Sequence, residues 1–589
     1  MKPFQVGLFF ILFVVIFYNC KPNREVKNCS TFKEMADPTA DTLSNWEDVK
    51  AGLNASWVNA NTRFAKSKAP EITESMSVHL TGWKGEKVSA QILVWSANDL
   101  KQLECELTDF SSSNRSLPVD IAQARFVRYV MTDIFEPGCG YRKPENFPAS
   151  LSADMLDNIE CMDIEGKTVR PIWITVDIPA TATAGEYVSR VNVYAKDQDT
   201  KELELKLTIQ DKTLPAPSEW TYHLDLWQHP SAVARTQNLE LWSDAHFEAM
   251  KPLFKMLADA GQKVITANVN KDPWNNQCYD KYEDMIIWTK NTDGTWSYDY
   301  KIFDKWVSFM MELGITKMIN CYSMIPWNNE LNYVDASTGQ TVTVKADPGT
   351  PLFKDMWTPF LNDFTKHLNE KGWLEITNIA MDERSPKDME NAIELLQRVA
   401  PQLGISLADN HNSYKRYPFI REISVSADAK VDSADIAARR EKGLITNYYV
   451  CCSDKFPNVF TFSDPAEAVY SAWYAVAADY DGFLRWAYNS WVENPLTDSR
   501  FRTWPAGDTY IVYPEARSSI RFEKLIEGIQ DSQKIRILRE ELKDPSKSAE
   551  LQSLNDEIAK FNTIKPIESP NDMLVKAKEV INRLSENKN

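Results

Sequence analysis

The amino-acid sequence predicts a multidomain protein, with an N-terminal antiparallel β-sandwich followed by a (β/α)8 TIM-type barrel and a short C-terminal helical segment. Three observations predict this architecture. Short segments of alternating apolar and polar residues extend to residue 214, longer apolar runs then alternate with helical stretches to residue 534, and the remainder is charged and helical in pattern. The 589 residues are 43% hydrophobic and 25% charged, which excludes a wholly disordered chain.

Residues 1–20 are interpreted as a lipoprotein signal peptide. The apolar run at 6–18 fits a secretory signal and is shorter than the roughly 20 residues of a transmembrane helix. It ends at Asn19-Cys20, which resembles a bacterial lipoprotein processing site with Cys20 lipidated, although a small residue is usual where Asn19 stands. The alternatives are ordinary signal cleavage further on and a short uncleaved anchor.

These features predict an exported protein that is lipid-anchored to a bacterial membrane, on the periplasmic or surface face of the outer membrane. The polar residues 21–39 are expected to form a tether. The chain has nine cysteines, and eight remain without Cys20, so disulfides are permitted in an oxidising compartment although the spacing does not fix their pairing.

The β-sandwich is expected over residues 40–214. Period-2 alternation is clear at 88–94 and 171–176, and Pro and Gly separate such segments. Residues 184–210 predict a terminal hairpin with its turn near 197–199. Leu214-Pro215-Ala216-Pro217 is typical of a linker.

The barrel is expected over residues 218–534, and residues 535–589 are expected to be helical. Eight apolar runs predict strands at 222–227, 263–269, 317–322, 375–381, 404–408, 422–425, 445–451 and 482–488. Helical stretches are predicted at 244–260, 301–313, 351–371, 386–399, 432–442 and 465–479. Repeated alternation of strand and helix favours a (β/α)8 barrel, with a doubly wound sheet as the alternative.

Charge and composition narrow the function. With 66 basic and 83 acidic residues the net charge is −17, which argues against nucleic acid or an anionic membrane surface as the main partner. No zinc-ligand spacing and no glycine-rich nucleotide loop occurs in the sequence, so we expect no metal and no cofactor. The 19 tryptophans indicate either large cores or sugar binding by stacking of indole rings.

Carboxylates, amides and aromatic rings follow the predicted barrel strands, at the end where such barrels have their active sites. Asp382-Glu383 follows the strand at 375–381. The candidate substrate-binding residues at other strand ends are Tyr322, Trp327, His411, Arg485, Trp486, Asn489 and Trp491, and Trp274 is a further candidate. This combination fits glycoside hydrolysis, in which carboxyl groups act as acid and base and aromatic rings position the sugar.

Other residues are expected to have structural roles. Trp306, Trp357 and Trp473 fall within predicted helices and are expected in the core. Arg521, Glu523 and Glu527 lie on a predicted helix and are expected to form ion pairs.

The adjacency of Asp382 and Glu383 bears on mechanism. Neighbouring residues point to opposite faces of a strand, so both carboxylates reach one pocket only if the strand ends or bulges there. The alternative is a charged loop before a helix that begins at Pro386, with Ser385 as its N-cap. Adjacent carboxylates suit a substrate whose own 2-acetamido group attacks the anomeric carbon, an exception to the usual scheme of two opposed carboxylates.

Three segments resemble glycoside hydrolase family 123: the strand ending in MDE (381–383), GFLRWAYNSW (482–491) and GDTYIVYPEARSSIRFEKLIEGIQD (507–531). The resemblance covers roughly residues 40–535. It implies an exo-acting, retaining β-N-acetylgalactosaminidase that works by substrate assistance. Asp382 would then orient the acetamido group and stabilise an oxazolinium, and Glu383 would act as general acid and then general base.

The resemblance also brings Asp508 and Tyr510, in the third segment, into consideration as substrate contacts. The expected partner is a glycan with a terminal N-acetylhexosamine. Two alternatives stay open: a glycosidase acting on N-acetylglucosamine or a galactoside, and a surface glycan-binding lipoprotein without catalysis.

Overall fold

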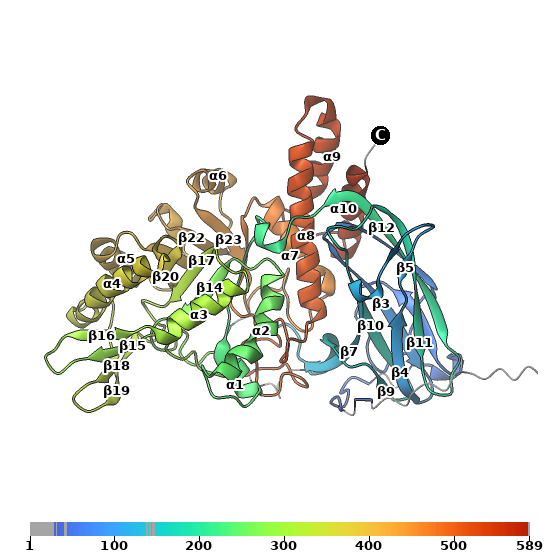
Figure 1. The fold of residues 1–589 in the computed structure, drawn as a ribbon, viewed down its shortest axis with the longest axis horizontal. Coiled ribbons are helices and arrows are strands. Elements are labelled where there is room, and N and C mark those ends of the chain that lie inside the picture. Colours follow the sequence, from blue (N-terminus) through green and yellow to red (C-terminus); the bar gives the residue numbers. More distant parts are fainter. Residues whose placement is uncertain are drawn as a thin grey trace, which may run out of the picture.

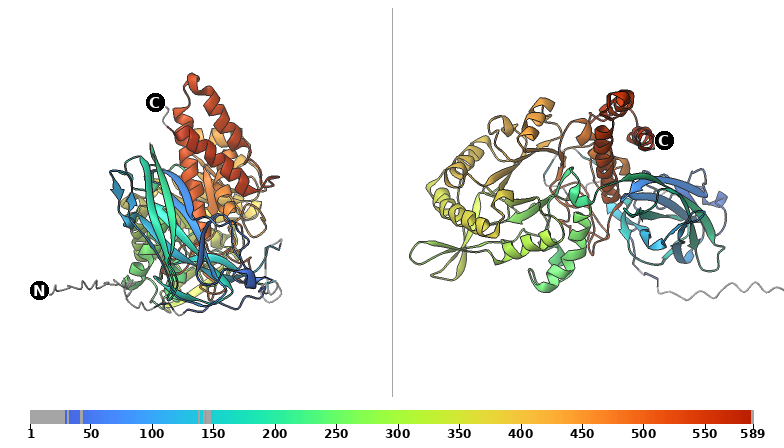
Figure 2. Two further views of the ribbon diagram at one scale, coloured as in Figure 1. Left: turned by 90° about the vertical axis from the view of Figure 1, so that its right-hand side faces the viewer. Right: turned by 45° about the horizontal axis from the view of Figure 1, so that its top comes forward.

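The computed structural model describes residues 29–30, 32–40, 44–136, 139–140, 143 and 148–586. A β-rich N-terminal region and a barrel region lie side by side, and the C-terminal helices lie near their boundary (Figures 1 and 2). The apolar run at 6–18 and Cys20 are outside the described residues. Within the described ranges, no helix has the length and apolar character needed to cross a membrane.

The N-terminal region consists of two sheets that share a core. The first has the order β1-β3-β10-β7-β8 and the second β2-β12-β11-β4-β9, with β5 and β6 attached to β11. The strands are β1 (Asn54–Val58), β2 (Ser77–Lys84), β3 (Lys87–Ser96), β4 (Leu100–Leu107), β5 (Phe110–Ser111), β6 (Ser116–Leu117), β7 (Ala122–Thr132), β8 (Ser150–Asp157), β9 (Met162–Ile164), β10 (Thr168–Asp177), β11 (Gly185–Tyr194) and β12 (Lys201–Thr213). Ile92 and Ile172 of one sheet pack in one cluster with Val191 and Leu205 of the other, because each strand turns alternate residues inward.

The pairing within these sheets is almost wholly antiparallel. The hairpin expected over 184–210 is confirmed as β11 and β12. One pair departs from the expected pattern, since β2 runs parallel to β12. These two strands are far apart in the sequence, so no tight turn constrains their relative direction.

The second region contains eight parallel strands in the order β13-β24-β23-β22-β21-β20-β17-β14. They are β13 (His223–Leu226), β14 (Val264–Asn268), β17 (Met318–Tyr322), β20 (Thr377–Asp382), β21 (Gly404–Asp409), β22 (Glu422–Ser426), β23 (Ile445–Tyr449) and β24 (Gly482–Arg485). Each predicted strand coincides with one of them. A bridge from Leu224 to Gln262 brings the first and last strands of the sheet together, so the barrel is nearly closed. Strand order follows the chain around the ring, without the reversal of a doubly wound sheet.

Helices follow most of these strands: α1 (Pro230–Thr236), α2 (Asp244–Ala258), α3 (Lys301–Glu312), α4 (Pro351–Lys371), α5 (Pro386–Val399), α6 (Ser433–Glu441) and α7 (Pro465–Ala477). Ser385 caps α5 by accepting a hydrogen bond from the Asp388 amide, and Pro386 is its first residue, as predicted. Between β21 and β22 the structure has only a 3-10 turn, at Ser413–Lys415.

A small sheet of order β16-β15-β18-β19 was not predicted. It consists of β15 (Ile287–Lys290), β16 (Trp296–Asp299), β18 (Glu330–Asp335) and β19 (Gln340–Lys345), which come from the connections after β14 and β17. Figure 1 shows it projecting from the barrel at the end away from the sandwich. Its strands have few buried residues, so they lack the apolar runs that identify the barrel strands.

The long helix α8 (Ile520–Glu541) joins the two regions, with α9 (Ser548–Ala559) and α10 (Pro570–Ser585) beside it. The expected ion pairs are present. Arg521 contacts Asp154 of β8 at 2.9 Å, and Glu523 contacts Arg125 of β7 at 3.0 Å. The tryptophans expected in the core, Trp306, Trp357 and Trp473, are buried.

The segment expected as a tether is partly docked on the sandwich. Cys29 forms a disulfide with Cys161. The buried carboxylate of Glu34 accepts hydrogen bonds from Arg170 at 2.6 and 3.0 Å and contacts Lys66 at 2.8 Å. These charges hold the pKa of Glu34 at about 2 in spite of its burial. The prediction that a tether extends to residue 39 is therefore wrong, because Glu34, near its end, pairs with the buried Arg170 of the sandwich.

Candidate active site

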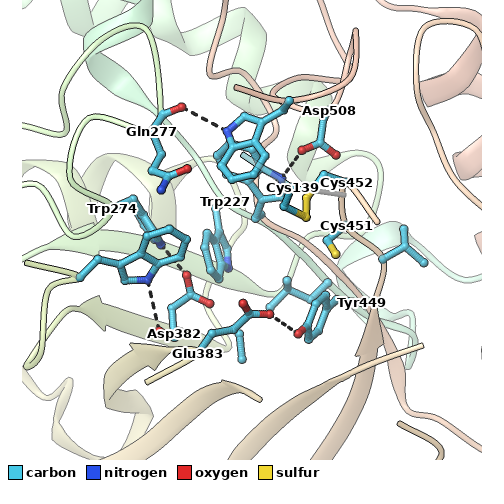
Figure 3. A pocket seen from close by; sticks show the side chains of 16 residues that line it. Cys139, Trp227, Trp274, Gln277, Asp382, Glu383, Tyr449, Cys451, Cys452 and Asp508 are labelled. Carbon is cyan, nitrogen blue, oxygen red and sulfur yellow. Dashed lines mark hydrogen bonds between the residues drawn. A yellow bond between two sulfur atoms is a disulfide. The ribbon is translucent and has the colours of Figure 1, made fainter. Parts of the chain in front are cut away.

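A pocket lies where the barrel strands end at their carboxyl termini (Figure 3). Its aromatic lining residues are Trp227, Trp274, Trp327, Tyr449, Trp486 and Trp504. Its acidic lining residues are Asp382, Glu383 and Asp508, and Gln277, Cys139, Cys451 and Cys452 also line it. Acidic groups and indole rings thus face one cavity.

The backbone at the end of β20 brings two adjacent carboxylates to the same pocket. β20 ends at Asp382, and Glu383 has φ of +45°, in the left-handed region that non-glycine residues rarely adopt. The Glu383 amide still donates to the Ala408 carbonyl at 3.0 Å, so the chain turns without leaving the sheet. Both side chains therefore point into the pocket (Figure 3). Such a conformation costs about 1–3 kcal/mol and is typical of functional positions.

Asp382 is held by two indoles. Trp274 Nε1 donates to Asp382 Oδ2 at 2.8 Å, and Trp327 Nε1 donates to the Asp382 carbonyl at 3.3 Å. Burial and the neighbouring charge of Glu383 raise the pKa of Asp382 to about 8, and the bond from Trp274 opposes this rise. Asp382 consequently keeps its proton near neutral pH.

Glu383 has a phenol as its partner. Tyr449, the last residue of β23, donates a hydrogen bond from Oη to Glu383 Oε1. Burial and the charge of Glu383 raise the pKa of Tyr449 well above its usual range, so the phenol keeps its proton and acts as a donor. The carboxylate is thereby oriented from the side of β23.

Asp508 and Gln277 lie across the pocket from the two carboxylates (Figure 3). Asp508 accepts from Trp486 Nε1 at 3.0 Å and from Arg485 Nη2 at 2.8 Å. Trp504 Nε1 donates to the Gln277 carbonyl at 3.2 Å, and its ring meets that of Trp486 edge to face, with centroids 5.8 Å apart.

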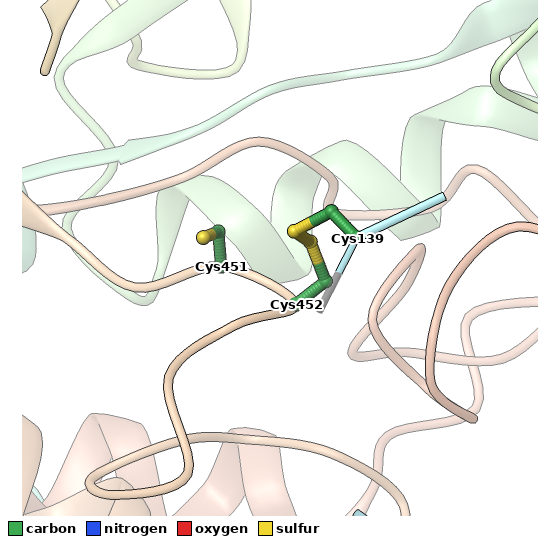
Figure 4. A group of neighbouring side chains, drawn as sticks. All are labelled: Cys139, Cys451 and Cys452. Carbon is green, nitrogen blue, oxygen red and sulfur yellow. A yellow bond between two sulfur atoms is a disulfide. The ribbon is translucent and has the colours of Figure 1, made fainter. Parts of the chain in front are cut away.

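Three sulfur atoms form part of the wall (Figure 4). Cys139, from the connection between β7 and β8 of the sandwich, is bonded to Cys452, which follows β23 of the barrel. Cys451 is a free thiol, and the Sγ atoms of the three cysteines lie within 4.8 Å of one another. Burial and the charge of Asp454 raise the pKa of Cys451 to about 12, so the thiol is poorly nucleophilic. The disulfide links the sandwich to the pocket.

The structure brings some of the predicted site residues together and places others elsewhere. Asp382, Glu383, Trp327, Trp486 and the further candidate Trp274 line the pocket. Arg485, Asn489, Trp491, Tyr322 and His411 are not among the lining residues.

Arg485, Asn489 and Trp491 have hydrogen-bond partners within the protein instead. Arg485 is fully buried against Asp508 and Asn458. Asn489 makes two hydrogen bonds of 2.9 Å to the His229 backbone. Trp491 Nε1 donates to the Val512 carbonyl. These placements favour structural roles over the expected sugar contacts.

The two other residues, Tyr322 and His411, lie outside the pocket lining. Tyr322 packs against Trp227 behind the pocket wall, with ring centroids 4.6 Å apart. His411 is exposed and follows β21, where its amide donates a hydrogen bond to the side chain of Asp409.

Several pocket residues were missed at the level of sequence. Trp227 is the last residue of a predicted strand, so the rule that selected Asp382 would have found it. Tyr449 lies within the predicted strand 445–451 and is the last residue of β23 only in the structure. Gln277, Trp504 and the cysteines come from loops, where no periodicity points to the pocket.

A pair of carboxyl groups in an indole-lined pocket, at the carboxyl end of a nearly closed parallel barrel, is the arrangement expected of a glycoside hydrolase. Models of the glycoside hydrolase 123 catalytic domain and of the glycoside hydrolase 123 N-terminal domain match residues 227–538 and 57–195. The chain belongs to glycoside hydrolase family 123.

Among solved structures, a family 123 glycoside hydrolase from Clostridium perfringens, described for glycolipid glycan hydrolysis, is similar to the chain. It is 27% identical with a TM-score of 0.81, and the match covers 90% of this chain and 97% of that chain. A family 5 xyloglucanase from Bacteroides ovatus is 10% identical over 81% of this chain and 100% of its own, at a TM-score of 0.28, too low to infer a common overall fold. No curated protein matches the sequence.

Proposed function

We propose that the protein is an exo-acting, retaining glycoside hydrolase that removes terminal β-linked N-acetylgalactosamine by substrate assistance. The observation that carries the proposal is the turn at Glu383, which places two adjacent carboxylates in one pocket. Adjacent groups are suited to neighbouring atoms of the substrate, whereas double displacement by a protein nucleophile uses carboxylates on opposite sides of the sugar.

The proton that Asp382 holds before substrate binds suits this chemistry. The substrate acetamido N–H donates to Asp382 and favours its ionised form, so the proton moves to Glu383. Glu383 then protonates the glycosidic oxygen while the acetamido oxygen attacks the anomeric carbon and the bond to the leaving group breaks. Ionised Asp382 stabilises the positive charge of the oxazolinium.

The second half-reaction regenerates the pair. Water attacks the anomeric carbon from the face that the leaving group vacated, and Glu383 takes a proton from it as general base. The bond to the acetamido oxygen breaks, which restores the acetamido group and gives net retention of configuration. Trp274 and Tyr449 fix the two carboxylates through both steps.

The decisive experiment compares Glu383→Gln and Asp382→Asn with the wild type on aryl β-glycosides of N-acetylgalactosamine, N-acetylglucosamine and galactose. We expect turnover only of sugars with the acetamido group, preferentially the galactosaminide. Each variant should lose about 10²–10⁴-fold in kcat. A loss of less than tenfold in Glu383→Gln would contradict the acid assignment, and turnover of the galactoside would contradict substrate assistance.

We also propose that the barrel is of the (β/α)8 TIM type and that the protein is exported and lipid-anchored through Cys20. The disulfides of Cys29 with Cys161 and of Cys139 with Cys452 support export, because disulfides persist in oxidising compartments. Expression of Cys20→Ser tests the anchor. We expect the variant to leave the membrane fraction, and unchanged fractionation would contradict lipidation at Cys20.

A further inference from the structure

One polar group in the pocket lacks a partner. The side-chain Oε1 of Gln277 is buried and accepts no hydrogen bond within the described part of the chain. Most buried polar atoms in folded proteins have a partner, so an orphan that faces a binding pocket indicates a ligand. The side chain points into the pocket in Figure 3.

The backbone of Gln277 is fully engaged while its side chain is not. Its amide donates to the Trp274 carbonyl at 3.2 Å, and its carbonyl accepts from Trp504 Nε1 at 3.2 Å. The residue is thus fixed between two indoles of the wall by contacts that do not involve the side-chain amide. An amide held in this way is preorganised for recognition.

The position of Gln277 restricts what it can contact. The proposed function places the reacting end of a sugar at Asp382 and Glu383, and Gln277 lies across the pocket from them (Figure 3). The groups that reach that side are the hydroxyls of the terminal sugar away from the anomeric carbon, at C3, C4 and C6. A hydroxyl supplies the donor that Oε1 lacks.

We propose that Gln277 is a specificity-determining residue that hydrogen-bonds one ring hydroxyl of the terminal sugar, at C3, C4 or C6. The proposal rests on the proposed function for the position of the anomeric carbon. It adds a recognition contact at the far end of the pocket, where Asp508 fixes Trp486.

The test uses the purified full-length protein and Gln277→Ala, with an aryl N-acetyl-β-galactosaminide and three analogues lacking the hydroxyl at C3, C4 or C6. We expect Gln277→Ala to lower kcat/KM roughly tenfold on the parent and on two analogues. On the third analogue the loss should be under twofold, because that substrate already lacks the hydroxyl partner. Gln237→Ala, at the end of α1 and outside the pocket lining, is the matched control and should be unchanged on all four.

An equal loss on all four substrates, or no loss on any, would overturn the proposal, since a structural role does not depend on one hydroxyl. Wild-type inactivity on the parent would instead contradict the proposed function. In that case calorimetry with free N-acetylgalactosamine and its three deoxy analogues gives the same comparison for binding. An affinity for N-acetylgalactosamine that Gln277→Ala leaves unchanged would then overturn the inference.

Discussion

The indole of Trp274 donates from Nε1 to Asp382 Oδ2 at 2.8 Å and stacks on Trp227 with ring centroids 4.9 Å apart. One side chain therefore both orients the Asp382 carboxylate and forms part of the wall of the pocket. The wall and the carboxylate are thus fixed relative to one another before substrate binds, which is the preorganisation that catalysis by charge stabilisation requires.

We expect Trp274→Phe to keep the ring packing and lose the hydrogen bond to Asp382, with kcat lowered about tenfold and KM changed less. A hydrogen bond to a carboxylate favours its charged form, so its loss raises the pKa of Asp382 further. The acid limb of the kcat/KM profile should then move to higher pH. Trp504→Phe is the control for the position of the acid limb, because its Nε1 donates to the Gln277 carbonyl and not to Asp382. An unmoved acid limb in Trp274→Phe would show that this bond does not govern the ionisation of Asp382.

The raised pKa of Asp382 predicts that the site lowers the stability of the fold as pH rises. The pKa is about 8 in the folded protein and about 3.9 in an unfolded chain, so between these values the folded state binds more protons. The contribution of Asp382 to the free energy of unfolding is therefore highest at low pH and is lost as pH increases toward 8. Asp382→Asn removes this dependence.

Thermal unfolding of wild type and Asp382→Asn at pH 5, 6.5 and 8 measures the effect. The melting temperature of the variant should exceed that of the wild type by an amount that grows with pH. A difference that is constant across the three pH values would mean that the carboxyl has the same pKa in both states.

The strands of the barrel were predictable because they are short and almost wholly buried, and most contain an apolar stretch such as residues 379–381 of β20. The carboxylate pair followed from its position after such a run. The side to which a strand-end residue points was not predictable. Arg485 is the last residue of β24 and is buried on Asp508, whereas the next residue, Trp486, lines the pocket.

The residues that remote segments contribute to the pocket could not be predicted from the sequence either. Cys139 reaches the pocket from the sandwich, 313 positions from its disulfide partner Cys452. Such a contact depends on how the sandwich and the barrel pack against one another. The docking is set by buried pairs such as Arg521 with Asp154, and no local pattern specifies it.

The disulfide between Cys139 and Cys452 gives a prediction about substrate binding. In the double variant Cys139→Ser, Cys452→Ser the sandwich connection is no longer linked to the pocket wall, so we expect KM to rise severalfold. The kcat should change little, because the partners of Asp382 and Glu383 come from other segments. The melting temperature should also fall, since the disulfide closes a long loop. Cys451→Ser, which leaves the disulfide intact, is the control. An unchanged KM in the double variant would show that the linkage is only structural.

The last prediction concerns the docking of sandwich and barrel through Asp154. Its carboxylate is fully buried between Arg521 at 2.9 Å and Arg63 at 3.1 Å, and it accepts a hydrogen bond from Tyr513 at 2.7 Å. The charges of the two arginines lower the pKa of Asp154 despite burial, so its contribution to stability is present above pH 4 and is lost as pH falls. Removal of one partner of a buried ion pair leaves the other charge uncompensated. We therefore expect Asp154→Ala to destabilise the protein by about 3–5 kcal/mol.

Urea unfolding at pH 7 and at pH 4 checks this, with Asp211→Ala as the control, because Asp211 forms an exposed pair with Lys84. The exposed pair should contribute far less than the buried one, because solvent screens its charges. The deficit of Asp154→Ala should be smaller at pH 4 than at pH 7, since the wild-type carboxylate begins to lose its advantage there. Equal deficits for the two variants at pH 7 would show that the buried cluster does not hold the sandwich to the barrel.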